Sequence, residues 1–209
     1  SELMETRGEK EHWEQVYSEK APTSVSWYQG TPEPSLRALE RLNISPGSSI
    51  IEIGGGASTF VDALLELGWN DITVLDIAAP AIEAARSRLG GVADKVDWQV
   101  ADITEWRPTR NYDVWHDRAV FHFLTEAEQR AAYLRALGEG LPADGFLIMA
   151  TFALDGPEKC SGLPVRRYDA DSLAHELGPS FKLLESWKEE HTTPWGSKQA
   201  FTWSIFRRA

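Results

Sequence analysis

One short run of residues limits the possible folds of this chain more than any other. Residues 50–53 read Ile-Ile-Glu-Ile, which predicts a buried strand, and three glycines follow at once at 54–56. Glycine lets the backbone turn sharply and approach a ligand closely. Asp76 closes the next apolar run, and a carboxylate at the end of a strand accepts hydrogen bonds from ribose hydroxyls. Together the strand, the turn and the acid predict a site for the adenosine end of a nucleotide-like cofactor.

The spacing of the glycines favours one kind of cofactor over another. A dinucleotide-binding turn follows the pattern G-x-G-x-x-G, which requires a glycine at position 59. This chain has Thr59 there, and Ser58 before it. A nicotinamide-dependent dehydrogenase is therefore disfavoured, and it stays as an alternative outside the leading class.

The composition narrows the range of partners and compartments. Acidic residues outnumber basic ones by 32 to 21, and the formal charge of −11 repels phosphate backbones, so no nucleic acid is expected as a partner. Cys160 is the only cysteine, which excludes an internal disulfide and a cysteine metal cluster, and no metal is expected. No apolar run approaches the roughly 18 residues of a membrane span or forms a signal peptide. A cytoplasmic location without a membrane partner is expected.

Strand-like and helix-like segments alternate along most of the chain. Such alternation predicts parallel strands with right-handed crossovers and helices on both faces of the sheet. Two β-rich runs, 181–190 and 199–206, close the chain and are expected to pair as an antiparallel hairpin. The expected helices lie at 9–19, 34–42, 58–67, 79–89, 125–137 and 171–177, and the remaining strands at 49–53, 72–76, 96–101, 112–116 and 145–152.

The chain shows no repeat and no domain linker, so residues 4–209 are expected to form a single domain. Its parts are an N-terminal helical lid segment (4–45), a cofactor-binding core (46–152), and a substrate-side loop with the closing hairpin (153–209). The longest stretch expected to lack regular structure, 153–168, follows the carboxyl end of a strand, where open α/β sheets bind ligands.

Four motifs occur in the order that a known family shows. They are Glu52–Gly56 after the first strand, Asp76 ending the second, 101–103 (Ala-Asp-Ile) ending the third, and 113–117 (Asp-Val-Trp-His-Asp) around the fourth. With the closing hairpin, the chain resembles the class I S-adenosylmethionine-dependent methyltransferases over nearly all of its length. The resemblance implies a Rossmann-like, seven-stranded, mostly parallel sheet, S-adenosyl-L-methionine as cofactor and S-adenosyl-L-homocysteine as product.

The resemblance also implies roles for individual residues. The glycine turn would pass beside the methionine part of the cofactor, Asp76 would bind the ribose hydroxyls, and Asp102 the adenine amino group, with Ile77 and Ile103 flanking the ring. Trp27 and Tyr28 are candidates for an aromatic lid beside the sulfonium, whose positive charge aromatic rings attract. The expected cofactor-binding residues are Trp13, Trp27, Tyr28, Glu52, Gly54, Gly55, Gly56, Ala57, Ser58, Asp76, Ile77, Ala101, Asp102, Ile103, Asp117 and Arg118.

The acceptor is less constrained than the cofactor. The N-terminal pattern of His12-Trp13 followed by Val-Ser-Trp-Tyr at 25–28 resembles small bacterial members of the family and some protein-lysine methyltransferases, including the enzyme that acts on citrate synthase. In those lysine enzymes the fourth strand ends in an Asp-Lys-Gly type of motif, whereas residues 117–119 here read Asp-Arg-Ala. A small-molecule acceptor is therefore expected, with a protein lysine as the alternative.

In-line methyl transfer depends chiefly on positioning, so few catalytic groups are needed. Asp117, Arg118 and His122 are the candidates, because the fourth strand of this fold ends opposite the reacting methyl group. A structural ion pair between Asp117 and Arg118, and a packed His122, are the alternatives. A chain that binds the cofactor without turnover and acts as a regulator is also open. Arg166 and Arg167 are expected to be solvated or to bind an anionic substrate, and Cys160 to be a packing residue.

Overall fold

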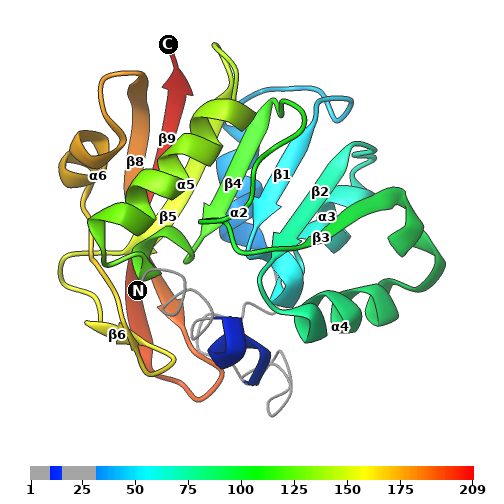
Figure 1. Cartoon of the computed structure of the whole chain (residues 1–209), viewed down its shortest axis with the longest axis horizontal. Helices are drawn as coiled ribbons and strands as arrows, with labels where there is room; N and C mark the ends of the chain where they lie inside the picture. Colours follow the sequence, from blue (N-terminus) through cyan, green and yellow to red (C-terminus); the bar gives the residue numbers. More distant parts are fainter. Residues whose placement is uncertain (1–9, 16–31) are drawn as a thin grey trace.

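The structure is a computed structural model that describes residues 10–15 and 32–209 (Figure 1). Within the helix expected at 9–19, residues 10–15 are helical. Trp27 and Tyr28, the expected aromatic lid, lie outside the described residues. Among the described residues, no helix has the length and apolar character needed to cross a membrane.

A seven-stranded sheet forms the centre of the molecule, in the order β3-β2-β1-β4-β5-β9-β8. The first five strands in the chain are mutually parallel, while β9 runs antiparallel to both β5 and β8. This arrangement confirms the predicted Rossmann-like sheet and its closing hairpin. The strands are β1 (Ile50–Ile53), β2 (Ile72–Asp76), β3 (Val96–Val100), β4 (Val114–Arg118), β5 (Phe146–Phe152), β8 (Phe181–Thr192) and β9 (Lys198–Arg208).

Helices cover both faces of this sheet. Figure 1 shows α5 on the viewer's side, with α2 and α3 behind. Parallel strands need such cover because both of their faces are apolar. The helices are α2 (Glu33–Glu40), α3 (Phe60–Glu66), α4 (Ala79–Leu89), α5 (Ala127–Gly140) and α6 (Ala170–Leu177), and the short 3₁₀ turns are η2 (Gly55–Ala57), η3 (Gly90–Lys95) and η4 (Phe121–Phe123).

The two faces of the sheet bury separate hydrophobic clusters. Ile50 of β1 packs in the cluster that α2, α3 and α4 cover, whereas Ile51 and Ile53 pack in the cluster under α5 and α6. Side chains alternate along a strand, so one strand supplies both clusters. The same alternation separates Asp117 and Arg118 at the end of β4.

The segment 153–168 is more ordered than expected. It contains a small antiparallel hairpin formed by β6 (Lys159–Cys160) and β7 (Leu163–Pro164). Ser161 and Gly162 form its turn with φ angles of 49° and 80°. The sequence prediction missed these strands because each is only two residues long, too short for a period-two pattern.

The position of β4 also differs from the prediction. The strand runs from Val114 to Arg118 and not over 112–116. Arg118 is therefore its last residue and lies at the carboxyl edge of the sheet. The strand order reverses between β1 and β4, since β2 and β3 lie beyond β1 while β5 lies beyond β4. In open α/β sheets, ligands bind outside the carboxyl ends of the strands at such a switch point.

Candidate active site

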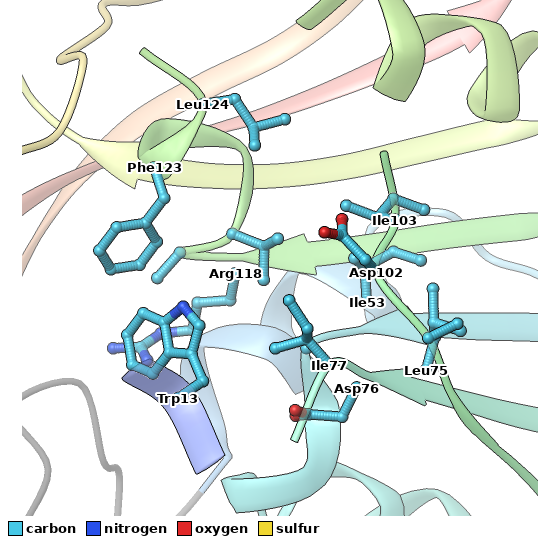
Figure 2. Close-up of a pocket in the computed structure, with 14 residues that line it drawn as sticks. Trp13, Ile53, Leu75, Asp76, Ile77, Asp102, Ile103, Arg118, Phe123 and Leu124 are labelled. Atoms are coloured by element: carbon cyan, nitrogen blue, oxygen red, sulfur yellow. The ribbon is translucent and has the colours of Figure 1, made fainter. Parts of the chain in front are cut away.

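A pocket of about 680 Å³, including the part open to solvent, lies at this switch point. Figure 2 shows side chains from the ends of several neighbouring strands turned toward it, with Trp13 near Arg118 and Phe123. The described residues that line it are Trp13, Ile53, Gly54, Leu75, Asp76, Ile77, Ala101, Asp102, Ile103, Arg118, Ala119, Val120, Phe123 and Leu124.

The turn after β1 is built so that only glycine fits. Gly54 has a φ of +71°, and a Cβ atom there would come within 2.3 Å of a Val120 side-chain carbon. A Cβ atom on Gly56 would approach the Ala81 Cβ to 2.7 Å and an Asp76 carboxylate oxygen to 2.9 Å. The backbone of the turn therefore lies against β2, α4 and the segment after β4 at once, and Gly54 lines the pocket.

Glu52 lies beneath the turn and does not line the pocket. Its carboxyl group is buried, and a Cβ atom on Gly55 would come within 2.4 Å of the Glu52 Cδ. Burial raises the pKa of Glu52 to about 8, so this side chain is largely protonated at neutral pH. In this position Glu52 supports the glycine turn from below.

Asp76 closes β2 and does line the pocket. Its two carboxylate oxygens each accept a backbone hydrogen bond, from Gly56 N and from Ala78 N, both at 2.9 Å. Burial raises its pKa to about 6, so the group is mostly ionised at neutral pH. Each carboxylate oxygen has capacity for a second donor, so ribose hydroxyls could still bind here.

Asp102 provides the test of whether an adenine ring fits the pocket. Its Oδ1 accepts hydrogen bonds from Thr104 N at 2.8 Å and from Thr104 Oγ1 at 2.7 Å. Its Oδ2 is buried and has no partner among the described residues. Burial raises the pKa of this carboxyl group. A buried acceptor atom needs a donor, and an adenine amino group between Ile77 and Ile103, which line the same pocket, would supply one.

Asp117, at the end of β4, faces away from the pocket. Its carboxylate accepts hydrogen bonds from Val120 N at 2.9 Å, from Phe121 N at 3.2 Å, and from the Tyr133 hydroxyl of α5. Burial raises its pKa to about 7. Asp117 and Arg118 do not form the ion pair that was weighed from the sequence, because they project to opposite faces of the sheet.

Arg118 projects into the other face and lines the pocket. Its guanidinium carbon lies 4.6 Å from the centre of the Phe201 ring. Burial lowers the pKa of Arg118 to about 10, against the opposing effect of Glu189, so the side chain stays positively charged at neutral pH. In Figure 2 it extends beside Trp13, away from Asp102.

His122 is part of the packing around the turn after β4 and does not line the pocket. Its Nδ1 accepts a hydrogen bond from Phe152 N at 2.9 Å, and its ring packs on Phe152 with centroids 4.6 Å apart. Burial lowers its pKa to about 3, so the imidazole is neutral. His116 packs within the sheet, with its Nε2 at 3.0 Å from Ser35 Oγ.

The structure thus separates the expected site residues into two groups. One group lines the pocket, and the other shapes the turns beneath it. The lining group consists of Trp13, Gly54, Asp76, Ile77, Ala101, Asp102, Ile103 and Arg118, while Glu52, Gly55, Gly56, Ala57, Ser58, Asp117 and His122 lie outside the lining.

Sequence reasoning also missed several lining residues. Phe123 packs edge-on against Trp13, with ring centroids 5.0 Å apart, and together they form one wall of the pocket. The missed residues are apolar, and an apolar residue in a strand or in the turn after it carries no signal that separates a ligand wall from core packing. They are Ile53, Leu75, Ala119, Val120, Phe123 and Leu124.

The sheet order, the glycine turn and the two strand-end acids define a Rossmann-like methyltransferase of class I. A family model described as a methyltransferase domain matches residues 51–147. The chain is an S-adenosylmethionine-dependent methyltransferase, which confirms the identification made from the sequence motifs, together with the cofactor.

Several known proteins are similar to this chain. A malonyl-[acyl-carrier protein] O-methyltransferase of Anoxybacillus flavithermus is 26% identical over 204 residues, covering 94% of this chain and 75% of that protein. EEF1A lysine methyltransferase 2 of Homo sapiens is 22% identical, covering 85% of this chain and 76% of that protein. The solved structure of an S-adenosylmethionine-dependent methyltransferase from Anabaena variabilis has the same fold, with a TM-score of 0.75, 15% identity, and coverage of 96% and 95%.

Proposed function

We propose that this chain transfers the methyl group of S-adenosylmethionine to a small-molecule acceptor. The observation that carries this proposal is the aromatic wall at the β4 end of the pocket, where Trp13 packs against Phe123. Trp13 belongs to the helical segment 10–15, so this segment contributes to the lining of the pocket. Sites for small molecules are concave and mostly apolar, with a few polar groups that fix orientation, and this pocket fits that description.

In this proposal, Asp76 binds the ribose hydroxyls, Asp102 accepts from the adenine amino group, and Ile77 and Ile103 flank the ring. The backbone at Gly54 lies beside the methionine part. The support is that all five residues line one pocket and that Asp102 Oδ2 lacks a donor. The assignment of Trp27 and Tyr28 to a lid remains a prediction from the sequence.

When bound, S-adenosylmethionine would supply an activated methyl group for transfer to an acceptor lone pair, with the electron pair of the broken carbon–sulfur bond left on sulfur. The protein's part is positioning and the exclusion of water. Trp13 and Phe123 shield the β4 end of the pocket. Asp117 holds the backbone of the turn after β4 through two N–H groups. In this proposal Asp117 and His122 act on the shape of the site and do not touch substrate.

The proposal is tested with methyl-labelled S-adenosylmethionine and a cell extract divided into a small-molecule and a protein fraction. Label should move into the small-molecule fraction. In the same preparation, Asp76→Ala should weaken binding of S-adenosylhomocysteine by roughly 1–3 kcal/mol, measured by calorimetry, because the hydroxyl donors lose their acceptor. Asp144→Ala, which changes an exposed acid away from the pocket, is the matched control. Label that moves only into proteins would contradict the small-molecule proposal.

A protein lysine is the second candidate acceptor, because a human relative named as a lysine methyltransferase matches 85% of this chain. The net charge of −11 would also favour a basic protein segment. The labelled protein fraction in the same experiment distinguishes the two acceptors. A cytoplasmic location remains a prediction from the sequence.

A further inference from the structure

The charges that line the pocket are unevenly distributed. Asp76 and Asp102 lie together at the β2 and β3 end, where the adenosine part is expected. Among the described lining residues, Arg118 is the one cation, and it lies at the β4 end beside Trp13 (Figure 2). The expected adenosine end is therefore acidic, and the end left for the acceptor is basic.

Arg118 is held so that its charge persists. The guanidinium stacks over the Phe201 ring, and Glu189 of β8 opposes the effect of burial on its pKa, which stays near 10. Glu189 is in turn fixed by a hydrogen bond from Trp203 Nε1 at 3.0 Å.

Among the residues that the structure describes, none that lines the β4 end of the pocket would remove a proton from an acceptor. The lining residues described there are aromatic or aliphatic, apart from Arg118. Asp117 projects to the opposite face of the sheet, and the neutral His122 does not line the pocket. An acceptor that is already anionic at neutral pH suits such a site better than a cationic amine, which Arg118 would repel.

The two arginines that the sequence offered for an anionic substrate, Arg166 and Arg167, make contacts outside the pocket. Arg166 lies 3.9 Å from a carboxylate oxygen of Glu176. Arg167 donates to the Gly156 carbonyl oxygen at 3.0 Å. Neither residue lines the pocket.

Resting on the methyl transfer proposed above, we propose that the acceptor is a small molecule with a carboxylate, and that the Arg118 guanidinium binds this carboxylate. An arginine fork matches carboxylate geometry and forms charge-assisted hydrogen bonds. The aromatic wall of Trp13 and Phe123 would pack against the apolar part of the same molecule. In this proposal Arg118 helps to select the methyl acceptor and does not bind the cofactor.

The experiment uses the purified protein saturated with S-adenosylhomocysteine, so that the cofactor's own carboxylate is already in place. Calorimetry then compares benzoate with benzamide, which have nearly the same shape and differ in charge. Benzoate should bind roughly tenfold more tightly or better, because a charge-assisted pair is lost with the amide. Arg118→Met should abolish this preference and leave the affinity for S-adenosylhomocysteine unchanged. Arg166→Met, the matched control, should keep the preference.

Three results would overturn the inference. The first is wild-type protein that binds benzoate no better than benzamide, a result that needs no variant. The second is a folded Arg118→Met protein, checked by circular dichroism, that loses affinity for S-adenosylhomocysteine, since Arg118 would then hold the cofactor carboxylate. The third is a preference for benzoate that survives in a folded Arg118→Met protein. Failure of the wild type to bind S-adenosylhomocysteine at all would instead contradict the proposed function.

Discussion

The Tyr133 hydroxyl of α5 donates a hydrogen bond to the carboxylate of Asp117 at the end of β4. Trp115 Nε1 donates in turn to the Tyr133 oxygen at 3.0 Å. This buried chain joins a helix to the turn after β4, where Ala119 has a φ of 70°. A non-glycine residue in that conformation needs support from its surroundings. Since Ala119 and Val120 line the pocket, the contact between Tyr133 and Asp117 helps to shape the site.

Tyr133→Phe should therefore lower the free energy of unfolding by about 1–2 kcal/mol, because a buried carboxylate loses one of its donors. The pKa of Asp117 should rise further, since the Tyr133 hydrogen bond lowers it. Urea denaturation measures the first effect. Calorimetry with S-adenosylhomocysteine should show weaker binding as the turn loosens. Unchanged stability and affinity would show that the hydrogen bond has no such role.

A second prediction concerns the glycine turn. Gly54→Ala should destabilise the protein more than Gly68→Ala does. Both positions have a positive φ, which costs a non-glycine residue roughly 1–2 kcal/mol. A Cβ at Gly68 meets nothing within 4 Å, whereas at Gly54 it would collide with Val120. Thermal unfolding gives the comparison, and only Gly54→Ala should weaken binding of S-adenosylhomocysteine. Equal losses of stability would contradict the packing argument.

The dependence of stability on pH should reflect the buried carboxyl groups. The pKa of Glu52 rises from 4.5 to about 8 on folding, so the folded state keeps a proton that the unfolded state releases. Its stabilising contribution is complete below the unfolded pKa and is lost as the pH rises through the folded pKa. The pKa values of Asp76 and Asp117 are also raised, which adds to the same trend.

Below about pH 6.5 the lowered pKa of His122 opposes this trend, because the unfolded state then binds a proton that the folded state does not. The free energy of unfolding should therefore fall most clearly between about pH 6.5 and about pH 8.5, by an amount on the order of a few kcal/mol. Glu52→Gln should flatten this slope, and Glu66→Gln, at an exposed position in α3, should leave it unchanged. Urea denaturation across this range measures the slope. A wild-type protein whose free energy of unfolding increases with pH over this range would contradict the raised pKa of Glu52.

Asp102→Asn tests the adenine contact with little change of shape. Thr104 N and Oγ1 both donate to Oδ1, so the amide oxygen should stay there and the amide nitrogen should replace Oδ2. Two donors would then face each other, and binding of S-adenosylhomocysteine should weaken by roughly 1–3 kcal/mol. S-inosylhomocysteine, with an oxygen in place of the adenine amino group, should not lose affinity in this variant. Equal effects on both ligands would contradict the contact.

The cofactor side of the site could be predicted from sequence because its chemistry is concentrated at strand ends. Glycines 54–56, Asp76 and Asp102 each follow an apolar run, and parallel strands bring their carboxyl ends to one edge. The acceptor side follows no such rule. Its wall includes Phe123, an apolar residue in a 3₁₀ turn, and alternation along β4 does not state which face Asp117 would take. The β6–β7 hairpin could not be predicted from the sequence either, because it depends on the packing of Cys160 against residues distant in the chain.

The position of β9 has a consequence for the newly made chain. β9 follows all other strands in chain order, yet it lies between β5 and β8. Until residues 198–208 have been synthesised, the backbone groups along one edge of β5 have no partner strand, and β8 has none to join. Exposed apolar edges of this kind promote association between chains. Pairing of β9 with β5 and β8 therefore covers one edge of the parallel strands and joins β8 to the same sheet.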